Sequence, residues 1–174
     1  MIRQDQLASG IASGYSTSLF SGTPVKYTTD GTLVAVGTGA DVCVGVFQGC
    51  EFSSAGHYFV LPYWPASQTY DTPAGNGILN PMWAFFTSDP GIIYEGQADG
   101  SVAMSANREG INLVDASQGS TYTGVSTQRL NHTTTGATAA TFQVVGLSGY
   151  PGNEWGDAFT IVQVKIASYQ GQIA

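Results

Sequence analysis

The sequence predicts an all-β fold: a single-domain jelly-roll or Greek-key β-sandwich or barrel with an extended N-terminal arm. Short runs of alternating apolar and polar residues recur along the chain, with turn signals about every 8–12 residues and almost no convincing helical pattern. Two long loops, and the lack of a simple hairpin after every strand, favour jelly-roll connections. We expect an arm over residues 1–21 and a β-sandwich or jelly-roll domain over residues 22–174.

The arm is predicted from its small, polar residues and thinly spaced apolar ones. Helical spacing of the apolar residues is opposed by Gly10 and Gly14, each of which costs about 1 kcal/mol inside a helix. An arm of this kind usually pairs with another chain or lies on the surface of its own domain. Its candidate partner contacts are Ile11, Tyr15, Leu19 and Phe20.

From residue 22 the chain has the pattern of strands joined by turns. The first hairpin joins residues 24–28 to 33–36 through Asp30-Gly31, the dipeptide most typical of a tight turn. Glycines within 42–52 predict bulges or close packing, and Pro62 suggests a sheet edge. The further strands are expected at 42–52, 57–64, 82–87, 92–97, 110–114, 122–130 with a break at Gly124, 140–147 and 159–166.

The charge of the chain argues against two classes of partner. It carries 12 acidic residues and 5 Lys and Arg, for a net charge of −7. Without a basic stripe, such a chain is repelled by phosphate, so we expect no direct nucleic-acid partner and no anionic membrane surface. No run reaches the roughly 18 apolar residues of a membrane helix. The start also lacks the apolar core of a secretory signal, so the protein is expected to remain where it is made or to leave inside a larger assembly.

Histidine, serine and cysteine patterns do not predict a catalytic or metal site. His57 and His132 are the two imidazoles, and nothing in the sequence groups either with a carboxylate. Ser126 lies in a stretch that only begins like GxSxG, because Gln128 replaces the last glycine. The two cysteines, Cys43 and Cys50, have the wrong spacing for a CxxC motif and are expected to be buried and unbonded.

Carboxylates also have simpler explanations than catalysis. Asp89 with Glu95, or Asp99 with Glu109, would suit glycoside hydrolysis, but both aspartates occupy turn sequences. The acidic stretch 153–157 lacks the spacing of a calcium loop and is expected to be a solvated loop. We therefore expect no enzyme activity, no metal and no cofactor.

Aromatic residues cluster beside the long loop 65–80. A carbohydrate-binding surface would use such rings as platforms, but aromatic residues also fill cores and dominate protein interfaces. Tyr63, Trp64 and Tyr70 are therefore candidate partner contacts, and Tyr58 and Phe59 are candidate core residues.

The order of several motifs resembles that of small structural proteins of tailed bacteriophages, the capsid decoration or cement proteins. The resemblance runs from about residue 10 to 170, and order carries more weight than any one motif. The segments are Gly22-Thr23-Pro24-Val25, Asp30-Gly31-Thr32-Leu33, Gly45-Val46-Phe47-Gln48-Gly49-Cys50, Asp89-Pro90-Gly91-Ile92-Ile93-Tyr94-Glu95-Gly96-Gln97-Ala98-Asp99-Gly100, Thr141-Phe142-Gln143-Val144-Val145-Gly146-Leu147 and Val162-Gln163-Val164-Lys165-Ile166.

The resemblance implies a virion protein, made in the host cytoplasm, on the outer capsid surface. It implies a jelly-roll-like fold that binds the major capsid protein, bridges neighbouring capsomers and stabilises the head, with no catalytic residues. A homo-oligomer, dimer or trimer, is expected. The alternatives are a tail- or fibre-associated adhesin domain that binds host glycans and, further off, a hydrolase acting on cell-wall polymers.

Overall fold

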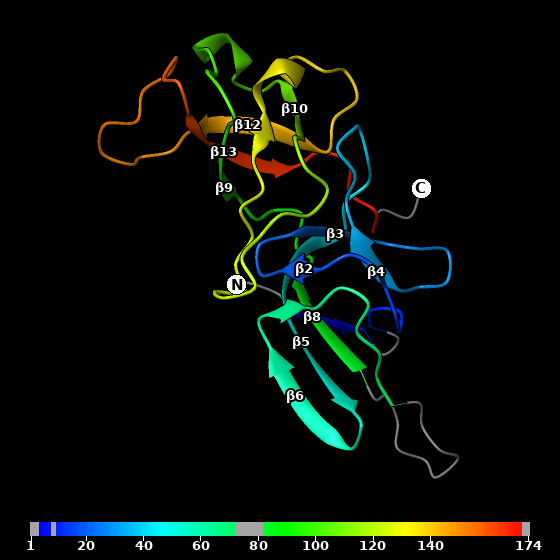
Figure 1. Cartoon of the computed structure of the whole chain (residues 1–174). Helices are drawn as coiled ribbons and strands as arrows, with labels where there is room; N and C mark the ends of the chain where they lie inside the picture. Colours follow the sequence, from blue (N-terminus) through cyan, green and yellow to red (C-terminus); the bar gives the residue numbers. More distant parts are fainter. Residues whose placement is uncertain (1–3, 8–9, 72–81, 172–174) are drawn as a thin grey trace. The chain divides into compact units, whose positions relative to one another are not determined.

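Strands make up nearly all of the regular structure in the computed structural model, which describes residues 4–7, 10–71 and 82–171 (Figure 1). In these ranges the only helical elements are two short 3-10 turns, η1 (Met104–Ala106) and η2 (His132–Thr134). The strands form three antiparallel sheets. This confirms the all-β class, while the jelly-roll connection stays a prediction.

The largest sheet has six strands in the order β1-β8-β5-β3-β4, with β6 added to the second half of β5. A register shift between Phe47 and Gly49 marks a bulge in β5, as its glycines predicted. The strands are β1 (Gln4–Leu7), β3 (Pro24–Tyr27), β4 (Leu33–Ala35), β5 (Gly45–Ser54), β6 (His57–Leu61) and β8 (Met82–Thr87).

Pro62 divides the expected strand 57–64 into two pieces with different partners. The first piece, β6, pairs with β5, and the second, β7 (Tyr63–Trp64), pairs with β2 (Leu19–Phe20) in a sheet of its own. Proline has no N–H to donate to a ladder, so a strand can end or change direction at this point.

The remaining sheet is five-stranded and curled, in the order β11-β10-β12-β13-β9. Its long central pair, β12 and β13, contains a second bulge between Val144 and Gly146. The expected strand 122–130 is mostly absent: it contributes two isolated bridges, at Val125 and Ser126, before the short strand β11. The strands are β9 (Tyr94–Gln97), β10 (Gly110–Leu113), β11 (Leu130–Asn131), β12 (Phe142–Leu147) and β13 (Ile161–Ile166).

The chain divides into two compact units, each with its own buried apolar residues. Unit 1 comprises 1–36, 44–88 and 117–127, and unit 2 comprises 37–43, 89–116 and 128–174. Large buried side chains of unit 1 include Phe47, Phe52 and Phe86, while unit 2 buries Ile111, Val144, Val162 and Val164. The single domain over 22–174 stays a prediction.

The described part of residues 1–21 is built into unit 1 and does not project as a free arm. β1 forms an outer strand of the six-stranded sheet by pairing with β8. Ile11 and Leu19 are fully buried in the unit 1 core, and the Gly10 carbonyl accepts a hydrogen bond from the Leu33 amide at 3.0 Å. This segment is therefore integrated more deeply than an arm lying on a domain surface.

Candidate contact surface

The seven residues predicted to contact a partner all pack within unit 1. Four of them, Ile11, Leu19, Phe20 and Trp64, are buried in this chain alone. The other three, Tyr15, Tyr63 and Tyr70, are half-buried. The role of all seven in binding a partner stays a prediction, but most of their apolar surface is already used inside the molecule.

Trp64 illustrates how the aromatic cluster is arranged. Its ring meets Phe52 and Tyr70 edge to face, with centroid separations of 5.3 and 6.2 Å. Trp64 is fully buried, and its Nε1–H has no hydrogen-bond partner among the described residues. Tyr63 instead stacks on Phe20, 5.8 Å between centroids. These rings are packed as a core, which leaves Trp64 unable to serve as a surface platform for a sugar.

Exposed apolar residues are found on β6, the strand that forms the cyan hairpin with β5 in Figure 1. Tyr58 and Val60 are each 64% exposed, and Phe59 is 38% exposed. Phe59 stacks on Phe52 of β5 at 5.2 Å, which fixes its ring on the inner side of the hairpin. The expectation that Tyr58 and Phe59 fill the core is therefore wrong for Tyr58 and only partly right for Phe59.

Two groups of hydrogen bonds hold the hairpin. Its tip is a two-residue turn in which Ala55 and Gly56 have φ of 50° and 76°, the left-handed pair of a type I′ hairpin. The Asp71 carboxylate accepts both turn amides, from Ala55 at 2.9 Å and from Gly56 at 3.1 Å. On the outer face, the Tyr58 hydroxyl donates to Glu51 Oε2 at 2.5 Å. This hydrogen bond raises the pKa of Tyr58, since ionisation would remove the donor and place an anion beside Glu51.

A second exposed ring lies in the anchored loop 117–127 of unit 1. Tyr122 is 97% exposed at the tip of a turn closed by a 2.7 Å bond from the Gly124 amide to the Ser120 carbonyl. The loop is fixed to the strand β2 region by Ser21, which donates to the Gly124 carbonyl and accepts from the Ser126 amide. Sequence reasoning missed Tyr122; its signal was a lone aromatic residue in a run of serine, threonine and glycine.

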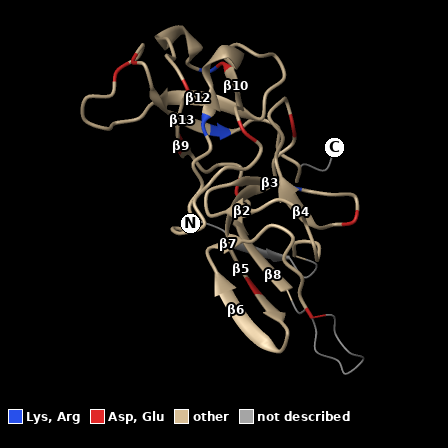
Figure 2. Cartoon of the chain, in the orientation of Figure 1, with Lys and Arg blue, Asp and Glu red and all other residues tan. Residues whose placement is uncertain are grey.

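Charges are sparse around these exposed rings. β6 carries no lysine, arginine, aspartate or glutamate and is tan throughout in Figure 2, and the sequence of β5 has Glu51 as its only charged residue. A contact made by this surface would depend on apolar burial and on main-chain or neutral hydrogen bonds. Such contacts respond less to salt than exposed ion pairs do.

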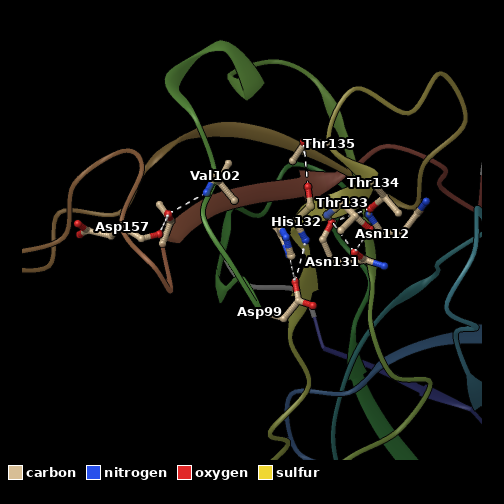
Figure 3. Close-up of polar contacts among 10 residues, drawn as sticks. Asp99, Val102, Asn112, Asn131, His132, Thr133, Thr134, Thr135 and Asp157 are labelled. Carbon is tan, nitrogen blue, oxygen red and sulfur yellow. Dashed lines mark hydrogen bonds and ion pairs between the residues drawn. The ribbon is translucent and has the colours of Figure 1, made fainter.

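Unit 2 contains one linked acid and imidazole, Asp99 and His132 (Figure 3). Asp99 Oδ1 accepts the His132 amide at 2.9 Å and lies 2.8 Å from His132 Nδ1. Burial alone would raise the pKa of Asp99, but the amide and ring of His132 outweigh it and lower that pKa. The aspartate thus fixes the imidazole at the start of η2, a pairing of residues that the sequence did not indicate.

The other sequence candidates take part in local hydrogen bonds. Asp89 Oδ1 accepts the Gly91 amide at 2.8 Å within its turn, and Glu95 Oε1 accepts the Ser148 hydroxyl at 2.7 Å. The Ser126 hydroxyl donates to the Gln118 carbonyl, and Asn153 fixes its loop through three bonds to Ser148 and Ile161. Among the described residues, no group of three or more His, Cys, Asp or Glu is arranged to hold a metal ion.

Both cysteines are buried and neither forms a disulfide, as expected from their spacing. Burial, with a smaller effect from Glu51, raises the pKa of the Cys50 thiol to about 12. Its Sγ lies 3.5 Å from the Tyr63 carbonyl oxygen. A thiol in this environment is a packing residue, because nucleophilic chemistry requires the thiolate.

Comparison with known proteins gives no relative: no family model, no curated protein and no solved structure matches this chain. Within the described ranges, no helix has the length and apolar character required to cross a membrane.

Proposed function

We propose that this chain is a structural protein of a phage virion. In this role it binds the outer capsid surface, joins neighbouring major capsid proteins and stabilises the head. Its motif order resembles that of capsid decoration proteins, and the all-β architecture is compatible with a rigid contact module. Jelly-roll connections of the strands belong to the same proposal.

The observation that carries the proposal is the high exposure of Tyr122 on a hydrogen-bonded turn. A tyrosine that is 97% exposed gains nothing from the fold, yet its turn is closed by two bonds to Ser120, from the Gly124 and Thr123 amides. Tyrosine is among the residue types that dominate protein interfaces, because it adds contact area at little cost in side-chain entropy.

The sparse charge of the chain supports the same role. Charged residues make up 10% of the sequence, and hydroxyl and amide side chains occupy many of its loops. A head protein must hold its position across changes in ionic strength, and interfaces of neutral hydrogen bonds and apolar contacts lose less affinity to screening than ion pairs do.

Co-sedimentation with capsids of the same virus, stripped of this protein, tests the proposal at low and at high salt. We expect saturable binding that persists at high salt. Replacement of Tyr122 by alanine should weaken it by about tenfold or more, as expected for a central aromatic contact. Thr121→Ala, in the same exposed turn, is the matched control and should bind as the wild type. Absence of wild-type binding would contradict the capsid role.

One observation favours the second candidate, an adhesin domain that binds host glycans. The exposed Tyr58 ring lies beside the Glu51 carboxylate, and an aromatic ring with a neighbouring carboxylate is a combination suited to sugar hydroxyls. Selective binding on a glycan array that is lost in Tyr58→Ala, together with no capsid binding, would favour this candidate. Trp64→Ala is unsuitable for the test because Trp64 is a core residue.

A further inference from the structure

β6 is a sheet edge with one side unpaired among the described residues. Its five residues pair with Cys50–Ser54 of β5, from Ser54 opposite His57 to Cys50 opposite Leu61, and with no other described strand. An edge of this kind presents main-chain N–H and C=O groups to solvent in a row and can template another strand.

The geometry of the hairpin determines which groups face outward. In a two-residue I′ hairpin, the residues that flank the turn, here Ser54 and His57, form the first hydrogen-bonded pair. Because hydrogen-bonded and non-bonded pairs alternate, the main-chain groups of Tyr58 and Val60 point away from β5. These two residues are each 64% exposed, against 38% for Phe59 between them.

The devices that usually protect an edge are lacking within β6. The strand has no lysine, no other charge and no internal proline, since Pro62 lies just beyond it. Natural sheets normally blunt an exposed apolar edge with such residues. The edge of β6, with the main-chain groups of Tyr58 and Val60 facing outward, is therefore suited to pairing with a further β-strand.

We propose that β6 pairs antiparallel with β6 of a second copy of this chain, about a two-fold axis at Phe59. In this register Tyr58 lies opposite Val60 of the other copy, and Val60 lies opposite Tyr58 of the other copy. Each of these residues then exchanges both its N–H and its C=O with the residue opposite, so every outward main-chain group of Tyr58 and Val60 has a partner. The two six-stranded sheets would join into one continuous sheet. This inference does not rest on the capsid role.

The self-complementary side chains identify a second copy as the occupant. The register forms two aromatic–β-branched pairs on the outer face and one Phe59–Phe59 pair on the inner face, all among the favourable cross-strand combinations. Although each chain has a net charge of −7, β6 brings no charge to the seam. Glu51 of each copy would be three strand spacings apart and offset by two residues along the strands, roughly 16 Å in all, where salt screens their repulsion.

Sedimentation equilibrium of the purified full chain, without capsids, tests the pairing. We expect a reversible dimer, and we expect Val60→Lys to raise its dissociation constant at least about tenfold, because a lysine at the edge blocks strand addition. Val60→Ile keeps size and β-branching and should dimerise as the wild type. Val60→Pro is a second variant that removes one outward N–H while leaving the β5 ladder intact, and it should also be monomeric.

A cysteine at the two-fold position tests the register directly. In Phe59→Cys the two new thiols lie opposite each other in a non-bonded pair and should form a disulfide-linked dimer on mild oxidation. His57→Cys is the matched control: it lies opposite Leu61 of the other copy and should not cross-link. Equal cross-linking of both variants would overturn the register.

A wild type that remains monomeric at all concentrations would overturn the proposal, as would a dimer that Val60→Lys leaves unchanged. A monomer whose capsid binding is abolished by Val60→Lys would assign the edge to a capsid strand instead. Because the dimer is measured without capsids, its failure and the failure of the capsid role are separate results.

Discussion

Asp99 holds His132 through a single oxygen, Oδ1, which accepts the main-chain amide at 2.9 Å and lies 2.8 Å from Nδ1 of the ring. The two residues are 33 positions apart, and the ring lies against Gly100, where an added Cβ would be 2.5 Å from Nδ1. The pair joins the turn after β9 to the start of η2, so it stabilises the connection between two parts of unit 2.

Asp99→Asn should lower stability by about 1 kcal/mol near neutral pH, because it weakens charge-assisted bonds to a residue that is 38% exposed. Since the folded-state pKa of Asp99 is lowered, its contribution is present above the unfolded-state pKa and is lost as pH falls through the folded-state pKa. Urea unfolding from pH 7 to pH 2 measures this: the difference between wild type and variant should shrink in acid. Asp30→Asn, at an exposed turn, is the control, and a difference that is constant with pH would contradict the prediction.

Gly45→Ala should destabilise unit 1 by about 3 kcal/mol, because an added Cβ would lie 1.7 Å from the Thr87 carbonyl oxygen of the neighbouring strand. The atoms closest to this Cβ are backbone atoms of Thr87 and Ser88, which cannot move away as a flexible side chain could. Chemical denaturation measures the loss, and Gly39→Ala is the control because, beyond its chain neighbours, no described residue has an atom within 4 Å of the added Cβ. Equal stability of the two variants would show that the β5–β8 seam can open.

Leu19→Ala should cost about 3 kcal/mol, since Leu19 is fully buried in the unit 1 core. A residue that served only to contact a partner would be exposed in the free chain and would cost little. Thermal and urea unfolding of the isolated protein measure the difference, with the exposed Ser16→Ala as a control. An unchanged unfolding midpoint would restore Leu19 as a partner contact.

Cys50 should be inert in the native protein, because its thiol has a pKa of about 12 and is buried. At pH 8 we expect negligible labelling by a thiol reagent, and labelling of both cysteines in denaturant. The Cys50→Ser variant identifies the signal of each residue. Rapid labelling of Cys50 under native conditions would contradict the buried environment.

Local sequence was a good guide to individual strands. β8 (Met82–Thr87) has the predicted bounds, because alternation and flanking turn residues agree there. The strand expected at 122–130 with a break at Gly124 is lost over most of its length: Gly124 adopts φ of 72° in a tight turn, and its added Cβ would lie 2.4 Å from Pro62. Turn chemistry outweighed the β-branched residues in this stretch.

The candidate site was less predictable, because apolar patterning indicates that a residue is buried but does not distinguish burial in the core of its own chain from burial against a partner. Leu19 and Trp64 have the composition of interface residues, but they are covered by their own unit. Tyr58 is exposed because it lies on the outer face of an edge strand, a position that depends on sheet order. The Asp99–His132 pair likewise required the tertiary fold to bring two distant turns together.

The two units are interleaved along the chain, and this prevents either from behaving as a transferable module. The backbone passes from one unit to the other after residues 36, 43, 88, 116 and 127. No single truncation separates one unit from the other, because a piece that holds all of unit 1 runs from 1 to 127 and one that holds all of unit 2 runs from 37 to 174. A fusion or recombination event that exchanged a contiguous half would therefore cut through both units.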